Sequence, residues 1–169
     1  MSIVIQNLSK TFFPGTSREH MALKNVDLTI QEGDFITIVG GNGAGKSTFL
    51  NAIAGNFALD EGTISFGDKQ IEQTADYERA AYISRVFQDP MQGTAPRMTV
   101  AENLALANRR GQKRSLFNSS SKEELQQFEA LLAPLGLGLE DRLHTEIGLL
   151  SGGQRQAISL LMATMNAPQ

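Results

Sequence analysis

One glycine-rich segment of the sequence has the residue types needed to hold a phosphate group. Residues 40–48 read Gly-Gly-Asn-Gly-Ala-Gly-Lys-Ser-Thr, and the first eight fit the pattern G-x-x-x-x-G-K-[ST]. Glycine backbones can point several consecutive N–H groups at one anion, and a helix that follows adds its positive dipole end. The segment therefore predicts a nucleotide phosphate-binding loop; the competing interpretation is a glycine-rich turn that precedes a helix by chance.

The residues of this loop act on the nucleotide through both backbone and side chains. Gly40 and Gly45 allow backbone angles and a close approach that a Cβ atom would forbid. Lys46 is expected to bind the β- and γ-phosphates and so to take part in catalysis, Ser47 to ligate Mg²⁺, and Thr48 to bond near the α-phosphate. The expected nucleotide contacts in the loop are Gly40, Asn42, Gly43, Ala44, Gly45, Lys46, Ser47 and Thr48.

A second glycine-rich segment lies far along the chain from the first. Residues 150–154 read Leu-Ser-Gly-Gly-Gln. Ser151 is a good N-cap residue for a helix, and Gln154 completes a capping box by reaching back to the N-cap backbone. Gly152 and Gly153 leave the helix start bare, and a bare N-terminus with its positive dipole end suits a γ-phosphate. Taken alone, the segment fits an ordinary capped helix equally well.

Together, the two segments resemble the signature of ATP-binding cassette (ABC) ATPases, and the resemblance covers nearly the whole chain. It implies that two cassettes pair head to tail, with each ATP held between the phosphate loop of one subunit and the second segment of the other. Ser151, Gly152, Gly153 and Gln154 would then contact the ATP of the partner subunit, and Ser151 would act in catalysis in trans. One chain therefore cannot form a complete site.

The resemblance also assigns roles to two residues outside these segments. Gln88, within residues 86–90, falls in the family's Q-loop, which implies contact with Mg²⁺ and with the attacking water; a surface Gln after a strand is the alternative. Phe12 falls where the family places an aromatic that stacks on adenine, and stacking requires only a flat π-face. A Phe packed in the core at a strand end is the alternative, and Phe13 competes for the same role.

The motifs need strands and a helix to position them, and the sequence indicates these elements. Alternation over residues 26–30 predicts a half-buried strand, and residues 62–67 a short strand between glycine turns. The apolar run 35–39, directly before the phosphate loop, predicts a central strand buried on both faces. A further strand is predicted within residues 81–87, and a helix over residues 48–54.

Helices are predicted in the second half of the chain by capping boxes. The three pairs are Thr99 with Glu102, Ser121 with Glu124, and Ser151 with Gln154. Behind the second pair, Leu125, Phe128 and Leu132 recur at helical spacing. The basic residues within 109–114 and the polar residues 118–121 indicate a solvated link, and contact with a membrane or with nucleic acid is the alternative.

The predicted fold class is α/β: a P-loop NTPase core with a mixed sheet around the phosphate loop, an antiparallel β part and an inserted helical subdomain. The expected organisation is the first part of the nucleotide-binding core over residues 1–89, the helical subdomain over 90–150, and a helix over 151–169 that returns toward the core. The family's next elements, a strand ending in Asp, a catalytic Glu and a switch His, are not found. We therefore expect a cassette truncated before that strand and inactive as an ATPase by itself.

Composition excludes several other classes of protein. The 169 residues are 41% hydrophobic and 20% charged, which excludes a largely disordered chain, and the net charge of -3 argues against a nucleic-acid partner. The absence of Cys excludes disulfides and thiolate metal sites. No secretory leader and no apolar run as long as a membrane span is seen. The resemblance implies a cytoplasmic protein that is peripheral on the inner face of the cell membrane.

The resemblance implies an ATP-binding subunit of a bacterial, importer-type ABC transporter. Such a subunit binds ATP and Mg²⁺ and, when full-length and homodimeric, hydrolyses ATP to power solute transport by a separate membrane permease. The resemblance also implies a solute-binding protein as a partner. Residues 82–96 resemble the subgroup that accompanies permeases for branched-chain amino acids and simple sugars. The alternatives are a nucleotide-binding module without turnover and a non-transport ABC ATPase. Residues 150–154 disfavour a P-loop kinase or GTPase.

Overall fold

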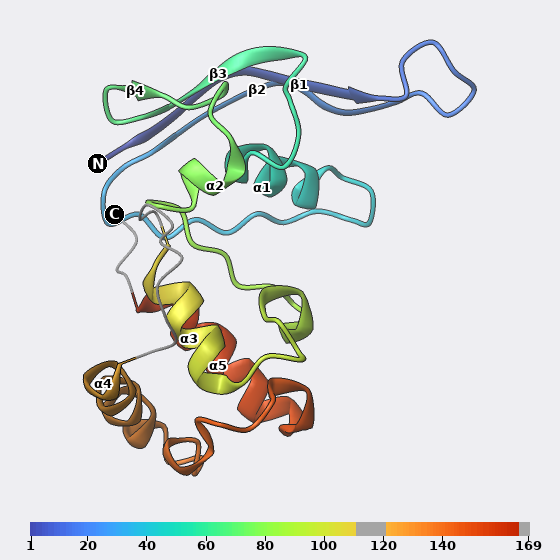
Figure 1. Cartoon of the computed structure of the whole chain (residues 1–169). Helices are drawn as coiled ribbons and strands as arrows, with labels where there is room; N and C mark the ends of the chain where they lie inside the picture. Colours follow the sequence, from blue (N-terminus) through green and yellow to red (C-terminus); the bar gives the residue numbers. More distant parts are fainter. Residues whose placement is uncertain (111–120, 166–169) are drawn as a thin grey trace. The chain divides into compact units, whose positions relative to one another are not determined.

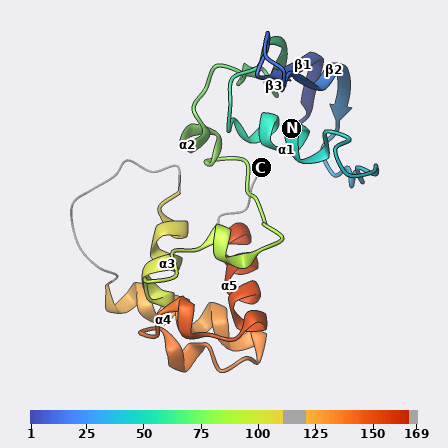
Figure 2. The ribbon, with the colours of Figure 1, turned by 90° about the vertical axis from the view of Figure 1, so that its right-hand side faces the viewer.

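The computed structural model describes residues 1–110 and 121–165. The chain divides into two units, Met1–Ala80 and Ala81–Gln169. Figures 1 and 2 present these units from two sides. Residues 111–114 and 118–120 of the predicted solvated link lie outside the described ranges. The expected division at residues 89 and 150 concerns subdomains of a complete cassette and stays a prediction.

The first unit is built on an antiparallel sheet. Its strands are β1 (Ile3–Phe12), β2 (His20–Ile30), β3 (Glu61–Phe66) and β4 (Lys69–Gln70), and their order is β2-β1-β3-β4. Ile5 of β1 lies opposite Leu28 of β2 and Ile64 of β3, so apolar side chains line up across the sheet. Helices α1 (Lys46–Ala54) and α2 (Asp76–Arg79) lie on one side of the sheet (Figure 1).

The core of the first unit explains why these elements form. Alternate residues of β1 and β3 turn toward the helices, and Ile5 and Ile64 are fully buried. α1 supplies Phe49, Ala52 and Ile53 from one helical face. The predicted strands over 26–30 and 62–67 and the predicted helix over 48–54 are confirmed, because they fall in β2, β3 and α1.

The predicted central strand over residues 35–39 is wrong for this structure. No strand is assigned between β2 and α1, and the side chains of Phe35 and Val39 are 94% and 88% exposed. A strand requires hydrogen-bonded neighbours, and no described segment pairs with these residues. The predicted strand within 81–87 is wrong for the same reason. Among the described residues, the expected mixed sheet is thus represented by its antiparallel part.

The second unit is helical. Its helices are α3 (Val100–Asn108), α4 (Lys122–Leu132) and α5 (Gly152–Thr164), with 3₁₀ turns η1 (Pro90–Gly93), η2 (Ala133–Leu135), η3 (Glu140–Arg142) and η4 (Ile147–Leu149). α3 and α5 lie side by side (Figure 2). The predicted apolar spacing in α4 is confirmed, because Phe128 and Leu132 are buried in this unit's core and Leu125 packs against it. Throughout the described ranges, no helix has the length and apolar character needed to cross a bilayer.

Two of the three predicted capping boxes form completely. In α3, Thr99 Oγ1 accepts from the Glu102 N–H, and Glu102 Oε2 accepts from the Thr99 N–H. α5 begins in the same way with Ser151 and Gln154.

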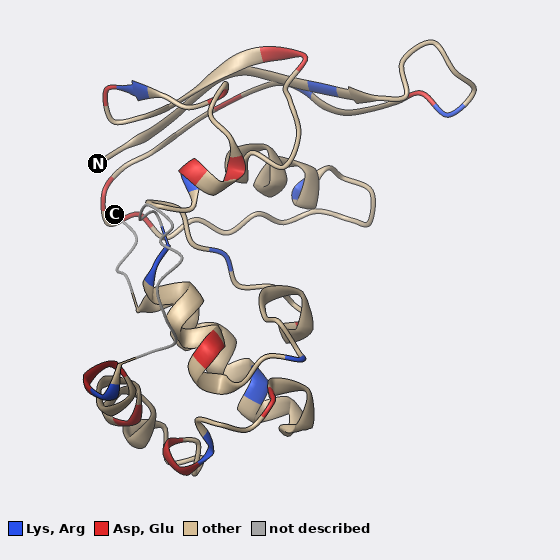
Figure 3. Cartoon of the chain, in the orientation of Figure 1, with Lys and Arg blue, Asp and Glu red and all other residues tan. Residues whose placement is uncertain are grey.

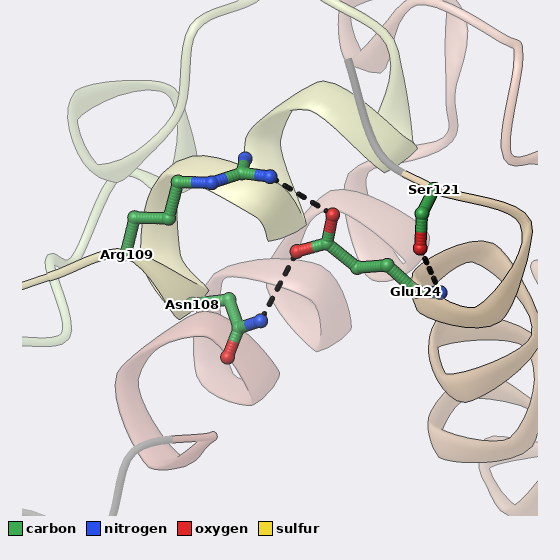
Figure 4. Close-up of polar contacts among 4 residues, drawn as sticks. All are labelled: Asn108, Arg109, Ser121 and Glu124. Atoms are coloured by element: carbon green, nitrogen blue, oxygen red, sulfur yellow. Dashed lines mark hydrogen bonds and ion pairs between the residues drawn. The ribbon is translucent and has the colours of Figure 1, made fainter. Parts of the chain in front are cut away.

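The third box is formed on one side only. Ser121 Oγ accepts from the Glu124 N–H at 3.2 Å, but the Glu124 carboxylate accepts from Asn108 Nδ2 and Arg109 at the end of α3 (Figure 4). The predicted hydrogen bond from the Ser121 N–H to the Glu124 carboxylate is therefore wrong. The Arg109 cation and the Asn108 amide bind this carboxylate, and a cation is the stronger partner for it than a backbone N–H.

Candidate nucleotide-binding site

The phosphate loop between residues 40 and 46 needs glycine at specific positions. Gly43 and Gly45 both have φ near 81°, in the left-handed region that favours glycine. A Cβ atom on Gly45 would lie 2.5 Å from the carbonyl oxygen of Ala22 on β2. Gly40 has an ordinary φ, and a Cβ there would approach the Ala44 Cβ to 3.1 Å. Gly45 thus seats the loop against the sheet, which fixes where α1 begins.

α1 begins with bare backbone N–H groups. Its N-cap is Gly45, which makes no side-chain cap, and α1, described over its whole length, has no acidic residue in its first turn (Figure 3). The first N–H groups of a helix have no partner inside the helix and carry the positive end of its dipole. The start of α1 therefore offers donors and positive potential to an anion.

Lys46 adds a full positive charge to this helix start. Its ammonium folds back over the loop and donates to the carbonyl oxygens of Gly40 at 2.6 Å and Gly41 at 2.7 Å. An ammonium has three N–H donors, so one donor remains for a ligand. Asn42, Gly43, Ala44 and Ser47 are exposed around the loop, and Thr48 is half-buried in the first turn of α1.

The second predicted segment forms the start of α5 in the other unit. Ser151 Oγ accepts from the Gln154 N–H, which leaves the hydroxyl hydrogen of Ser151 free to donate. Gly152 and Gly153 are exposed, and a Cβ built on either would meet no atom within 4 Å. The helix start is thus open, as the sequence predicted.

Gln154 is engaged within its own chain at both ends of its carboxamide. Oε1 accepts from the Ser151 N–H at 3.1 Å, and Nε2 donates to the Leu137 carbonyl oxygen at 3.0 Å. Leu137 lies between Gly136 and Gly138, which both have φ of 64°. Gln154 therefore ties a glycine turn to the start of α5.

The structure places the predicted residues in two separate groups. Phe12 and the phosphate loop belong to the first unit, whereas Gln88 and residues 151–154 belong to the second. Gln88 is exposed and precedes Asp89, which caps η1 by accepting from the Met91 N–H. Within the described part of the chain, no three His, Cys, Asp or Glu residues gather as a metal site.

Phe12 lies in an aromatic and charged cluster that the sequence did not indicate. Its ring meets that of Phe57 edge to face, with centroids 5.4 Å apart. Lys10 Nζ lies 5.7 Å from both ring centroids and pairs with Asp60 at 2.7 Å. The hydrogen bond from Lys10, followed by that from the Thr11 N–H, holds the pKa of Asp60 below its ordinary value. Lys10 and Phe12 are two residues apart on one strand, so their side chains share a face. This spacing was the sequence signal that could have indicated the cluster.

Sequence comparison relates this arrangement to known proteins. The sequence model of the ABC transporter family matches residues 23–169. A tyrosine transport ATP-binding protein of Clostridioides difficile is 39% identical over 165 residues, which cover 98% of this chain and 65% of the relative. The sulfate/thiosulfate import ATP-binding protein CysA of Halalkalibacterium halodurans is 36% identical over 170 residues, which cover 100% of this chain and 44% of the relative. The chain thus spans under two thirds of the length of these relatives.

Solved structures agree with the sequence relatives on the fold. A dimeric post-hydrolysis state of the ATP-binding cassette MJ0796, bound to ADP and Pi, matches with a TM-score of 0.78 at 30% identity, over 98% of this chain and 70% of that one. The ADP conformation of the cassette MJ1267 matches with a TM-score of 0.74 at 29% identity, over 99% and 66%. The predicted ABC ATPase fold class is confirmed, and the chain belongs to the ABC transporter family.

Proposed function

We propose that this chain binds ATP with Mg²⁺ as the ATP-binding subunit of an importer-type ABC transporter. The observation that carries the proposal is the start of α1, where uncapped N–H groups and the Lys46 ammonium converge on one loop. A triphosphate has the negative charge and the acceptor oxygens that can pair with these N–H donors and with the ammonium. The names of the relatives, which are ATP-binding proteins of transport systems, support the same function.

The residues of the loop suit the separate parts of the ligand. Backbone N–H groups of residues 43–48 would surround the β-phosphate, and Lys46 would bind the β- and γ-phosphates through its remaining donor. Gly40, Asn42 and Ala44 would shape the loop around them. Ser47, exposed beside Lys46, would hold Mg²⁺. The metal would neutralise charge that develops on the phosphate oxygens during transfer.

Hydrolysis would require a second copy of the protein. In a head-to-tail homodimer, the Ser151 hydroxyl and the open backbone at Gly152 and Gly153 would meet the γ-phosphate held by the partner. Gln154 would position this helix start, since its own polar atoms are engaged. Gln88 would orient the attacking water. The cassette MJ0796, which is dimeric in a post-hydrolysis state, supports pairing of two copies.

As part of a transporter, the protein would work at a membrane. A permease, together with a solute-binding protein, would supply the transport path, and the ATPase would lie on the cytoplasmic face of the membrane. Residues 90–100 would accept the permease, and Met91 and Met98, both half-buried, would supply adaptable apolar surface there. The 169-residue chain itself is expected to turn over ATP slowly. Binding without turnover is thus the second candidate function, and phosphate release measured on the purified chain separates the two.

The decisive experiment measures the affinity for ATP with Mg²⁺ by isothermal titration of the wild type and of Lys46→Ala. A charge-assisted hydrogen bond contributes about 1.5–3 kcal/mol, so the substitution should weaken binding by about one to two decades. Thermal unfolding should be nearly unchanged, because Lys46 contacts its own loop rather than the core.

A matched control is Lys69→Ala, which removes the same charge from β4, outside the phosphate loop. It should bind ATP as the wild type does. Equal affinity of the wild type and Lys46→Ala would contradict the proposed site, and an equal loss in both variants would show that only net charge matters.

A further inference from the structure

Four residues of the first unit, Lys10, Phe12, Phe57 and Asp60, form a cluster at the end of β1, here called the Phe12 support. The rings of Phe12 and Phe57 meet at an interplanar angle of 78°, which is the edge-to-face arrangement favoured by aromatic quadrupoles. Phe12 is half-buried, so part of its ring remains accessible. The support therefore fixes the Phe12 ring without covering it.

Phe57 reaches this place because of how α1 ends. Gly55, with φ of 82°, closes the helix, and its N–H and that of Asn56 bond back to carbonyl oxygens in the last turn. The chain then reverses, and the Asp60 N–H donates to the Ser9 carbonyl oxygen at 3.2 Å. The segment 57–60 is thus fastened to α1 at one end and to β1 at the other.

The charged pair fastens the same segment a second time. The Asp60 carboxylate accepts from Lys10 Nζ at 2.7 Å and from the Thr11 N–H at 2.6 Å, directly before Phe12. The side chain of Lys10 is only 15% exposed, and its ammonium lies equally far from both rings. A cation within about 6 Å of an aromatic face is attracted to it. Phe12 is therefore restrained both through its ring and through its backbone.

We propose that Phe57, Lys10 and Asp60 are positioning residues that hold Phe12 ready to stack on a flat nucleobase. The inference rests on the proposed ATP site and adds the origin of its selectivity. The phosphate loop binds any triphosphate chain, whereas the Phe12 support distinguishes a nucleoside triphosphate from a triphosphate without a base. Because the ring is already restrained before the ligand binds, binding loses less side-chain conformational entropy.

The test compares two ligands, ATP and inorganic tripolyphosphate, each titrated with Mg²⁺ into the 169-residue chain. Phe57→Ala should weaken ATP binding about threefold to tenfold and leave tripolyphosphate binding unchanged, as expected for loss of one aromatic pair. Phe57→Leu, which keeps most of the volume, should fall between the wild type and Phe57→Ala. Phe12→Ala should lose at least as much ATP affinity as Phe57→Ala.

Two further variants complete the comparison. Tyr77→Ala removes an exposed aromatic on α2 and should change neither affinity. Phe13→Ala, at a residue that is 62% exposed, should also leave the ratio of the two affinities unchanged. A variant that binds tripolyphosphate as the wild type does is folded. If Phe57→Ala loses tripolyphosphate binding, the ratio of the two affinities is taken from Phe57→Leu instead.

The outcomes separate the two proposals. An unchanged ratio of ATP to tripolyphosphate affinity in the Phe57 variants, or a fall confined to Phe13→Ala, would overturn the role of the Phe12 support. Equal weakening of both ligands in Phe57→Leu would also overturn it, because a purely structural role predicts that result. If the wild type binds neither ligand, or if Lys46→Ala binds both as the wild type does, the proposed ATP site itself fails.

Discussion

Asp60 is the residue whose charge fastens β1 to the segment that follows α1. Its carboxylate has two donors, Lys10 Nζ and the Thr11 N–H, and both stabilise the ionised form, which lowers its pKa. A carboxyl group with a lowered pKa in the folded state stabilises the fold above its unfolded pKa. That contribution is lost as the pH falls through the lowered folded pKa.

We therefore predict a pH-dependent difference between the wild type and Asp60→Asn. At neutral pH the wild type should be more stable, by no more than about 1 kcal/mol because the pair is partly exposed to solvent. The difference should begin to shrink near pH 4, the ordinary range of an Asp side chain, and vanish at lower pH. Thermal unfolding followed by circular dichroism from pH 7 to about pH 3 measures it. A difference that stays constant over this range would contradict the role of the ionised carboxylate.

Residue types alone identified the phosphate loop and the capped start of α5, because both depend on local backbone chemistry. The contacts of Gln154 and the support behind Phe12 could not be predicted in this way. Leu137 and Phe57 reach these sites through turns at Gly138 and Gly55, whose directions depend on the packed structure. Sequence patterns thus indicate groups that are close along the chain, and miss partners brought in by tertiary packing.

At the scale of elements, Arg79 joins α2 to the end of α1. Its side chain is 2% exposed, and Nη1 donates to the carbonyl oxygens of Ala52 and Ile53, both at 2.9 Å. Nε donates to the Thr74 carbonyl and hydroxyl oxygens, both at 3.2 Å. The guanidinium thus donates to the carbonyl of Ile53 and adds a second donor to that of Ala52, which also accepts from the Gly55 N–H, and its charge suits the negative end of the α1 dipole.

We predict that Arg79→Met destabilises the first unit by about 1–3 kcal/mol, the cost of leaving buried polar groups without partners. Arg79→Lys should be less damaging, because it keeps the charge but has no planar fork of donors. Arg18→Met, at an exposed position, is the control and should change stability little. Urea denaturation followed by circular dichroism gives the three values. Equal stability of Arg79→Met and the control would contradict the capping role.

Elements with local signals were predicted correctly, and elements that depend on distant partners were not. The capping boxes of α3 and α5 and the alternation in β2 depend only on residues that are close along the chain. The run at 35–39 has the composition of a buried strand, yet hydrogen-bonding neighbours decide whether it forms one. No described segment supplies these neighbours, so the run forms no strand and is exposed.

At the scale of the whole molecule, the first unit has an apolar face that no other element of that unit covers. A cavity of about 420 Å³ is lined by residues of β2, by residues 36–39 and by the start of α1. Leu23, Val26 and Leu28 line it from the sheet, while Phe35 beside it is almost fully exposed. An exposed, contiguous apolar surface of this kind favours association with other chains.

We therefore predict that the 169-residue chain self-associates as its concentration rises. Light scattering should give a mass that increases with concentration, and a dye that binds apolar surface should fluoresce with the wild type. Replacing both Phe35 and Val39 by Ser, which removes two side chains that are 94% and 88% exposed, should lower both signals. Leu149→Ser removes a 75% exposed side chain from the second unit and should lower them less. A constant monomer mass without dye binding would show that this face is covered in solution, and an equal effect of Leu149→Ser would place the association outside residues 35–39.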